Sequence, residues 1–509
     1  MATRKKRKKK IKFNNLLILL VLLSSCFLIY NILLFGNIET QIRYIIIGFI
    51  ILINIIFFLI KQKKNKTIAT IMMIFFIIIN IIGSLSINKV YSIIDSFNKG
   101  EVIYSSSLIT LNDNSINSVN DVKKTKIGLI DDTMSIDNYV IAKEIIDEEE
   151  LDKNNEIISY DDMLVMINDL YDKKIDCMFI SSNYNSMFEG IEGYDDFGNK
   201  VKVITDKDKP ISKTHNSFSL KNGNDIKPFS ILLMGVDSEK DGLKRNGYAN
   251  CDSLILMTFN PDTLNITMMS IPRDSYLPIA CRDNKKNKLT HAGWFGTDCM
   301  IDTIENAFDT EINYYVKINF KGVVSLVNTL GGVTVDVPKR LCTDNSNRQG
   351  EICIDKGIQS LDGEGALVLA RNRYDLSQGD IDRGYNQQLL IKAIINKLSE
   401  VRDVNKILDI LETISNNIDT SLTTDEIISF YDIFKDILGS RKYQKTEDFL
   451  NIIQIKVKGD GKMIYFDNLK RRLWTYQLDK NSIKEASDEM KTNLGLKEPN
   501  IIKDFEFKP

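Results

Sequence analysis

The feature that most constrains this chain is a set of three apolar runs near its start. They cover residues 16–35, 44–60 and 68–87. A helix of about 20 apolar residues crosses the ~30 Å hydrocarbon core of a bilayer. A cleaved signal peptide would end in a small-residue cleavage site followed by polar sequence, whereas here two further apolar runs follow the first. The pattern therefore predicts three transmembrane helices.

Basic residues around these runs predict their orientation. The first thirteen residues contain eight Lys or Arg, the first loop holds one Glu and one Arg, and the second loop adds Lys61, Lys63, Lys64 and Lys66. Lys and Arg are enriched on the cytosolic side, which places the N-terminus and the second loop there. Three crossings leave everything after about Asn88 outside the cell, so we expect a multi-pass protein of the cell membrane.

The remaining sequence is acidic. Residues 1–67 carry thirteen Lys or Arg and one Glu, a balance of +12, so the net charge of −2 leaves −14 for residues 68–509. Binding to nucleic acid requires a basic surface. The charge therefore argues against a nucleic-acid partner.

We expect five segments: a cytosolic basic tail (1–13), transmembrane helices (14–88), an extracellular accessory domain (89–225), a second extracellular domain (226–495) and a tail (496–509). In the accessory domain, predicted strands at 127–130, 156–160 and 175–180 alternate with predicted helices at 137–147 and 161–171. This order indicates a small α/β layer with parallel strands. It weakly resembles half of a periplasmic-binding-protein lobe, but it has no Gly-rich phosphate loop, which favours a spacer or interaction role. Residues 212–225 look like a linker.

The second extracellular domain is predicted to begin with a buried strand that ends at Asp237. A hairpin of residues 254–260 and 264–274 follows, joined by turn residues 261–263. Helices are expected at 298–309 and 319–330, then a strand at 331–338, and a mainly helical region to about Leu438. The chain as a whole is of the α/β class.

Charged residues stand at the ends of apolar runs in this domain. They form three pairs: Asp237 with Asp252, Arg273 with Asp274, and Arg371 with Arg373. On a strand, Arg371 and Arg373 would share a face with Leu367 and Leu369. An apolar strip that ends in a cation fits a ligand made of a hydrocarbon and a phosphate.

A helix from Asp380 is predicted to contribute to the same pocket. Asp380, Arg383 and Gln387 step by three and four residues, so they share one helical face. The simpler alternative is that these acids and arginines only pair with one another at the rim of the sheet. Three such clusters together favour a functional site.

Seven short motifs carry a family resemblance. They are GVD (235–237), CDSLILMTFNP (251–261), SIPRDSY (270–276), KLTHAGWFG (288–296), GGVTVDVP (331–338), LDGEGALVLARNR (361–373) and GDIDRGYNQQ (379–388). Together, over about residues 226–495, they resemble the LytR-CpsA-Psr family. Three membrane helices and an extra extracellular domain look like its CpsA-type, capsule-linked branch.

The resemblance implies that residues 226–495 form a catalytic domain, with α-β-α layers and a central mixed sheet. It also implies a phosphotransferase on the outer face of the membrane. Such an enzyme takes a glycopolymer, of the capsular or teichoic acid type, from an undecaprenyl diphosphate carrier and attaches it to peptidoglycan.

The resemblance also implies roles for individual residues. Mg²⁺ would be held by Asp237 and Asp252. The pyrophosphate would be bound by Arg273, Arg371, Arg373 and Gln387, with Lys288 as a further phosphate contact. Asp380 and Arg383 match an acid and an arginine of the family, and either Asp274 or Asp380 is expected to act as the base.

Two positions depart from the family pattern. Asn250 stands where many members have Arg, and Asn386 stands where an Arg often precedes the Gln pair. Each change removes a charge. These two positions give weight to one alternative, a non-catalytic polyprenyl-phosphate binder that regulates wall assembly. A second alternative is a pyrophosphatase with water as the acceptor, because the same residues would serve it.

Cysteine and histidine positions give further expectations. Cys281 and Cys299 flank KLTHAGWFG, and Cys342 and Cys353 flank a turn-rich loop, so we expect each pair to form a disulfide outside the cell. Cys177 and Cys251 are expected to be unpaired. His291 has no Ser or Cys nucleophile beside it, which favours a structural role.

Overall fold

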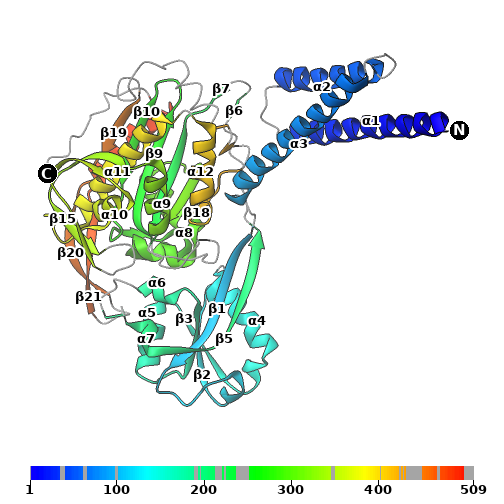
Figure 1. Ribbon diagram of the computed structural model, residues 1–509. Coiled ribbons are helices and arrows are strands. Elements are labelled where there is room, and N and C mark those ends of the chain that lie inside the picture. Colours follow the sequence, from blue (N-terminus) through cyan, green and yellow to red (C-terminus); the bar gives the residue numbers. More distant parts are fainter. Residues whose placement is uncertain are drawn as a thin grey trace. The chain divides into compact units, whose positions relative to one another are not determined.

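The computed structural model of the chain forms two compact units, which are described separately (Figure 1). One unit contains residues 1–98 and 423–440, and the other contains residues 99–422 and 441–509. The structure describes residues 2–34, 40–60, 66–97, 101–133, 135–188, 193–194, 196–212, 221–222, 225–236, 243, 251–344, 350–401, 403–423, 426–427, 429–430, 450–466 and 471–497.

Three N-terminal helices form the first unit: α1 (Ala2–Leu34), α2 (Thr40–Ile60) and α3 (Lys66–Phe97). Two segments within them, Asn15–Leu33 and Ile68–Ile93, are long and apolar enough to cross a membrane. The apolar part of α2, Arg43–Leu59, is shorter, because charged residues bound it on both sides. By length and composition, two of the three expected transmembrane segments are therefore long and apolar enough to cross a membrane.

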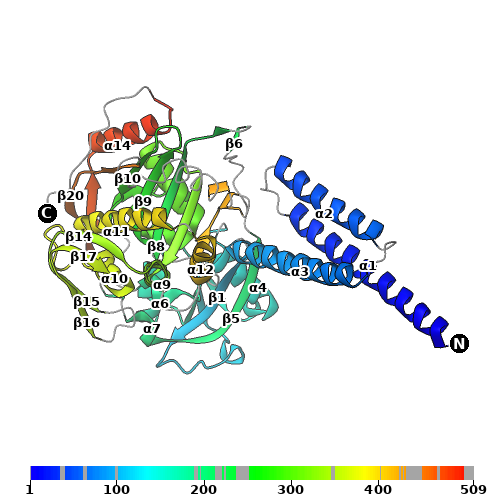
Figure 2. The ribbon, with the colours of Figure 1, turned by 45° about the horizontal axis from the view of Figure 1, so that its top comes forward.

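A polar network joins the three helices, which pack against one another in both ribbon views (Figures 1 and 2). The buried Asn80 of α3 donates through its amide to Ser24 at 3.1 Å and to Ser25 at 2.9 Å. Asn54 of α2 donates to Ser25 at 2.9 Å. Ser25 of α1 thus contacts both other helices.

The accessory domain is built on a five-stranded sheet of order β3-β2-β4-β1-β5. Its strands are β1 (Glu101–Leu111), β2 (Lys126–Ile130), β3 (Glu156–Tyr160), β4 (Cys177–Ser181) and β5 (Val201–Ser212). Its main helices are α4 (Ile141–Glu148), which continues a short π-helix (Ile136–Val140), and α5 (Met163–Tyr171). Strand β2 is parallel to β3 and to β4, so the predicted alternation is confirmed.

The sequence did not predict strands β1 and β5, which pair antiparallel along their length. Strand β1 contains three consecutive serines, of which Ser106 and Ser107 are buried, and β5 alternates Lys and Asp at the sheet edge. Neither composition is typical of a strand. Most of the predicted linker at 212–225 lies outside the described residues.

A six-stranded mixed sheet of order β18-β13-β8-β9-β10-β19 forms the centre of the catalytic domain. Its strands are β8 (Phe229–Val236), β9 (Cys251–Asn260), β10 (Asn265–Ser270), β13 (Tyr314–Asn319), β18 (Ile418–Thr420) and β19 (Asn451–Ile455). Strand β8 is parallel to β13 and antiparallel to β9, and β9 and β10 form the predicted antiparallel hairpin. The hairpin and the mixed sheet are thus confirmed.

Helices cover both faces of this sheet. They are α8 (Thr297–Phe308), α9 (Phe320–Leu330), α10 (Gly363–Arg371), α11 (Asp380–Glu400), α12 (Val404–Ile414) and α14 (Lys480–Asn493). Leu256 and Met269 pack into a core with α8 and α14. The strand residues of opposite parity, Ser253 and Ser270, meet α11. In Figure 2 the strands β9 and β10 run between α14 and α11, which gives the expected α-β-α layering.

The prediction of a strand over residues 367–373 was wrong. Residues Gly363–Arg371 form α10, because Asp362 caps the helix by accepting a hydrogen bond from the Gly365 amide at 2.8 Å. Leu367, Val368 and Leu369 are all buried, so the apolar run reflects a helix surrounded by protein. The expectation of a mainly helical region was also wrong upstream, where the chain forms β15 (Leu341–Asp344), β16 (Glu351–Ile354) and β17 (Gly357–Leu361).

Both predicted disulfides are present. Cys281 is bonded to Cys299, and Cys342 to Cys353 across the β15–β16 pair. Cys177 and Cys251 are buried and are not disulfide-bonded, as expected.

Candidate functional site

The site begins with an ion pair between two neighbouring strands. Because β9 and β10 are antiparallel, the start of β9 lies beside the loop that follows β10. Asp252 is the second residue of β9, and its Oδ1 accepts a hydrogen bond from Nη1 of Arg273 at 2.5 Å. The Asp252 side chain is 19% exposed and that of Arg273 13%, so water screens this pair only weakly.

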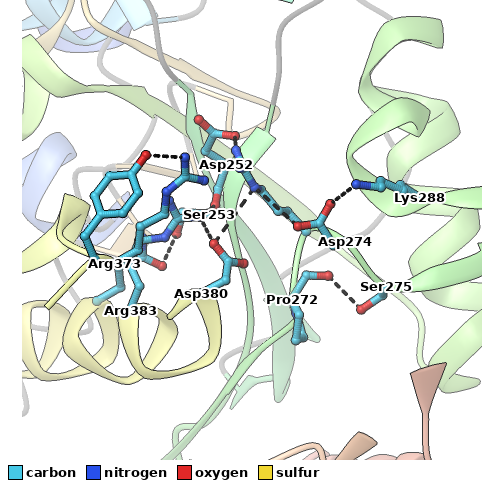
Figure 3. A network of polar contacts seen from close by, with 12 residues as sticks. Asp252, Ser253, Pro272, Asp274, Ser275, Lys288, Arg373, Asp380 and Arg383 are labelled. Atoms are coloured by element: carbon cyan, nitrogen blue, oxygen red, sulfur yellow. Dashed lines mark hydrogen bonds and ion pairs between the residues drawn. The ribbon is translucent and has the colours of Figure 1, made fainter. Parts of the chain in front are cut away.

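Arg273 lies among three carboxylates, those of Asp252, Asp274 and Asp380, which are labelled in Figure 3. Besides Asp252, its Nε is 3.9 Å from Asp274 and 3.9 Å from Asp380. Burial alone would lower the pKa of this guanidinium, but the three acids reverse the effect and raise it above its ordinary value. Arg273 is therefore a fixed positive charge.

Two further cations complete what we call the Arg273 cluster, which consists of Asp252, Arg273, Asp274, Lys288, Asp380 and Arg383. Lys288 Nζ is 2.7 Å from Asp274, and Arg383 Nη2 is 2.5 Å from Asp380 and 2.8 Å from the Asp252 carbonyl oxygen. Three acids thus face three cations. Each cation is already held in position by the acids, which lowers the cost of orienting it toward a phosphate.

Helix α11 is fixed against the sheet by close backbone contact. Ser270 donates to the carbonyl oxygen of Gly384 at 2.9 Å, and a Cβ at position 384 would lie 2.8 Å from the Ser270 Cβ. Gln387 accepts from Ser253 at 2.7 Å and donates to the Ala370 carbonyl at 3.0 Å. Gly384 therefore allows Asp380 and Arg383 to come close to the strand ends.

A small pocket opens between α11 and the two strands. It is lined by Asp252, Ser253, Leu254, Ser270, Ile271, Pro272, Asp380, Ile381, Arg383, Gly384, Tyr385, Gln387 and Val457. Its volume of about 20 Å³ is close to what one water molecule requires. A diphosphate would therefore have to displace the ion pairs that fill the site.

The structure brings most of the predicted site residues together. Arg273, Asp274, Lys288, Asp380 and Arg383 join Asp252 in the cluster, and Gln387 lines the pocket. Asp237 lies outside the described residues. The sequence analysis missed Ser253 and Ser270, although both are polar residues facing α11 inside the motifs of β9 and β10.

Arg371 and Arg373 lie beside aromatic rings. The Arg371 guanidinium lies over the Phe320 ring, 4.5 Å from its centroid, and Arg373 lies over Tyr374 at 4.9 Å. Among the described residues, neither is ion-paired with an acid of the cluster. Their expected common orientation assumed a strand, whereas Arg371 ends α10 and Arg373 follows it.

Of the two positions that depart from the family pattern, the structure describes only Asn386. Asn386 is fully buried, and among the described residues neither polar atom of its amide has a hydrogen-bond partner. Asn386 is not among the residues that line the pocket, so the loss of a charge at this position does not remove a contact within the pocket. Asn250 lies outside the described residues.

His291 is a buried structural residue. Its Nδ1 is 2.9 Å from Asn287 Oδ1, and its ring stacks on Trp294 with centroids 4.0 Å apart. Burial, followed by the charges of Lys288 and Arg273, lowers the pKa of His291 to about 3. The imidazole is therefore neutral, and its role is to pack against Trp294.

The donor chemistry of the cluster fits a hard divalent cation, because carboxylate oxygens are the preferred ligands of Mg²⁺. Asp252 offers one carboxylate at the pocket, and Asp380 offers a second. In the described ranges, the closest group of three Cys, Asp, Glu or His donors is instead Cys342, Glu351 and Cys353, and its two sulfurs are joined in a disulfide. That group is not a metal site.

Comparison with known proteins decides the family. The profile of the LytR_cpsA_psr family matches residues 193–492. The chain belongs to this family. The match begins upstream of the predicted catalytic-domain boundary at 226.

The chain is also similar to individual proteins of known sequence or structure. The chain is 35% identical over 268 residues to the polyisoprenyl-teichoic acid–peptidoglycan teichoic acid transferase TagU of Bacillus subtilis (strain 168), which covers 52% of this chain and 78% of that protein. It is 32% identical over 307 residues to biofilm regulatory protein A of Streptococcus mutans, covering 56% and 70%. The crystal structure of B. subtilis TagU is 30% identical and covers 54% of this chain and all of that one, with a TM-score of 0.39.

Proposed function

We propose that the protein transfers a wall glycopolymer from a polyprenyl diphosphate carrier to peptidoglycan. The observation that carries the proposal is the position of Arg273, a cation only 13% exposed among three carboxylates beside the pocket. The relative TagU is named for the transfer of teichoic acid from a polyisoprenyl carrier to peptidoglycan, which is the same reaction class. A teichoic acid or capsular polymer on undecaprenyl diphosphate is the proposed donor.

The reaction forms one bond and breaks another. A hydroxyl oxygen of the peptidoglycan acceptor attacks the phosphorus that bears the polymer, and the bond from that phosphorus to the bridging oxygen breaks. The polymer becomes attached through a phosphodiester, and the carrier leaves as a polyprenyl monophosphate with the bridging oxygen. Arg273 and Arg383 neutralise charge on the phosphoryl oxygens, the usual role of cations in phosphoryl transfer.

We propose Asp380 as the group that accepts the hydroxyl proton. Both acids are ion-paired, Asp274 with Lys288 and Asp380 with Arg383, but only Asp380 lines the pocket. A general base must come within hydrogen-bond reach of the proton that it removes. Asp274 is proposed to position Lys288 and Arg273.

We propose Mg²⁺ as the cofactor, held by Asp252 together with Asp237. The ion would neutralise diphosphate charge and polarise a phosphoryl oxygen. A phosphate that attracts Arg273 would free Asp252 Oδ1, which now accepts from that guanidinium, to bind the ion.

We propose that α2 also crosses the membrane, which would place the catalytic domain outside the cell. The hydrogen bond from Asn54 to Ser25 supports this, because Ser25 lies within the span Asn15–Leu33 and a buried polar group requires a partner at its own depth. Three crossings put the two α/β domains on the side opposite the basic N-terminus. The two disulfides are consistent with an oxidising compartment.

The deciding experiment uses the full-length protein in lipid nanodiscs. Lipid-linked polymer and a soluble peptidoglycan fragment are mixed with wild type, Arg273→Ala or the control Arg340→Ala. Arg340 is an exposed arginine of the same domain that pairs with Asp355 at 3.6 Å. We expect a phosphodiester-linked product by mass spectrometry from wild type and control, with loss of product for Arg273→Ala. Carrier binding without any turnover would favour a non-catalytic binder.

A pyrophosphatase side reaction is a second candidate. The pocket has room for about one water molecule next to Asp380, so water is a plausible competing acceptor. In the same assay without peptidoglycan, release of polyprenyl monophosphate that requires Arg273 would support it. Absence of any release would leave transfer as the reaction.

A further inference from the structure

A second, larger pocket lies between the accessory and catalytic domains of the second unit. Its volume is about 370 Å³, within the range of roughly 300–1,000 Å³ common for ligand sites. Asp161 and Met163 line it from the accessory domain, and Lys286, Asn287, Trp294 and Phe466 line it from the catalytic domain. We call it the interdomain pocket.

Side-chain contacts hold the two walls of the interdomain pocket together. Arg282 of the catalytic domain pairs with Asp132 at 3.8 Å and donates to the Asp161 carbonyl oxygen. The ring of Trp294 packs edge-on against Phe188 of the accessory domain, with centroids 5.7 Å apart. The pocket is therefore built from both domains and exists only when they are joined.

One short segment links this pocket to the Arg273 cluster. Asn287 lines the pocket, and its Oδ1 accepts from the backbone amide of the next residue, Lys288, at 2.8 Å. Lys288 in turn holds Asp274 at 2.7 Å. Occupancy of the pocket therefore acts on a segment that carries a cation of the catalytic site.

The lining combines features that suit an amphipathic glycan bearing a peptide. Phe295 and Phe466 offer apolar ring surface, and Asn287 offers an amide. At the rim, Lys285 and Asp161 have side chains 65% and 75% exposed and 3.9 Å apart. A weak exposed pair of this kind leaves both groups open to other partners.

The charge of the lining distinguishes two possible ligands. Three cations (Arg282, Lys285 and Lys286) are accompanied by two acids (Asp161 and Asp162). A uniformly anionic polymer would favour a lining with a strong excess of cations. A muropeptide has uncharged sugars, and its peptide carries both amino and carboxylate groups. The mixed charge therefore fits the acceptor better than the donor polymer.

From these observations we infer that the interdomain pocket binds the peptidoglycan acceptor, through an N-acetylated disaccharide with its peptide. This inference rests on the proposed transfer reaction and assigns the accessory domain one wall of the acceptor site. It also explains why a domain without a phosphate loop belongs to a phosphotransferase.

Ligand binding to the interdomain pocket can be measured by the fluorescence emission of a single tryptophan. The chain has two, Trp294 and Trp474, so Trp474→Phe leaves only the one that lines the pocket. The full-length Trp474→Phe protein in nanodiscs is titrated with a soluble disaccharide-peptide and, separately, with an oligomer of glycerol phosphate. We expect a saturable change in emission with the disaccharide-peptide and a Kd at least fivefold higher for the anionic oligomer. An unchanged emission with the disaccharide-peptide, or tighter binding of the oligomer, would overturn the inference.

Two matched pairs of variants locate the site. Phe466 lines the pocket, while its strand neighbour Tyr465 is half exposed and points to the opposite face. Lys286 lines the pocket, while Lys356 is exposed elsewhere in the same domain. In the Trp474→Phe background, Phe466→Ala and Lys286→Glu are expected to raise the Kd about tenfold, and Tyr465→Ala and Lys356→Glu to change it less than twofold. Equal effects within each pair would refute the assignment.

Transfer kinetics separate this inference from the proposed function. Lys286→Glu is expected to raise the KM for the peptidoglycan fragment about tenfold, with kcat and the KM for the lipid-linked donor within twofold of wild type. Wild-type transfer with an unchanged acceptor KM in Lys286→Glu overturns the pocket assignment and leaves the transferase. Saturable binding of the disaccharide-peptide without transfer by wild type overturns the transferase and supports the pocket as a glycan site.

Discussion

Nη1 of Arg273 lies 2.5 Å from Oδ1 of Asp252, so the guanidinium proposed to bind phosphate is already paired with a carboxylate. This pair joins the loop after β10 to the start of β9. A phosphate must therefore compete with Asp252 for Arg273. The exchange makes binding selective for ligands that carry strong negative charge.

Replacing Arg273 by Lys tests the need for a planar guanidinium. Lys keeps the charge but not the fork that contacts Asp252 while facing Asp274 and Asp380. We expect kcat/KM for transfer to fall roughly 100-fold, the usual effect of losing one transition-state donor. Arg340→Lys, at an exposed arginine, is the control and should stay within twofold. A wild-type rate for Arg273→Lys would remove this residue from the mechanism.

Gly384→Ala tests the contact between α11 and β10. The added Cβ would lie 2.8 Å from the Cβ of Ser270, so the helix must shift and carry Asp380 and Arg383 with it. We expect a loss of roughly 1–3 kcal/mol in the free energy of unfolding, as for overpacked cores, and transfer at least tenfold slower. Denaturant titration and transfer assays measure the two effects.

Gly365→Ala is the matched control, because Gly365 is also helical and a Cβ there would lie 3.3 Å from the flexible end of Leu361. We expect it to keep near-normal activity. Equal losses in both variants would show that helical glycines matter here only for stability.

The stability of the protein should fall in acid through His291. Its pKa is about 6.5 in the unfolded chain and about 3 in the folded protein, so the unfolded state takes up a proton first. The contribution of neutral His291 to the free energy of unfolding is complete above about pH 6.5. This contribution decreases by about 1.4 kcal/mol per pH unit as the pH falls toward 3. Melting temperatures of wild type and His291→Gln from pH 7 to 4 measure it. The variant should show the shallower decrease, and parallel curves would contradict the assignment.

Removing the Cys281–Cys299 disulfide should destabilise the catalytic domain. The bond closes a loop with a sequence separation of 18 and fixes the segment beside α8. Loops of this size contribute about 3 kcal/mol in the chain-entropy estimate. Cys281→Ser with Cys299→Ser is expected to lower the unfolding midpoint in denaturant by the corresponding amount. Non-reducing peptide mapping of wild type is the companion measurement, and four free thiols there would show that the prediction has no basis.

The side of the membrane on which the domain lies depends on whether α2 crosses. A reporter enzyme that is active only outside the cytosol, fused after residue 97, should be active in the wild-type context. Deleting residues 40–65 removes one crossing and should make the reporter inactive. An inactive reporter on the intact three-helix segment would place both α/β domains in the cytosol and reject the proposed topology.

The sequence predicts those parts of the fold where local pattern and tertiary structure agree. The β9–β10 hairpin follows from its alternating apolar residues and turn chemistry, and α11 follows from the spacing of Asp380, Arg383 and Gln387. Strand β1 could not be found this way, because the burial of Ser106 and Ser107 depends on neighbouring strands that arrive later in the chain. The helix α10 was misread because burial on all sides removes the periodicity that separates helix from strand.

For the site, the sequence identified the charged residues but not the contacts between them. The parity argument correctly set Arg273 at the end of the hairpin, yet it could not show that one guanidinium faces acids from β9, its own loop and α11. The interdomain pocket could not be predicted from the sequence, because Asp161 and Phe466 are separated by some 300 positions and are brought together only by domain packing.

The edge strand β19 has a consequence for how the protein is made. It pairs in parallel with β10, and Asn493 of the following α14 donates to Thr258 Oγ1 at 2.8 Å, so the last residues of the chain complete the sheet that carries Asp252. Synthesis runs from the N-terminus, so on the proposed topology β10 would leave the translocation channel almost two hundred residues before its neighbour β19 exists. During that interval its edge is an open template for the wrong strand. An export chaperone that covers β10 until the C-terminus emerges would therefore raise the yield of active protein.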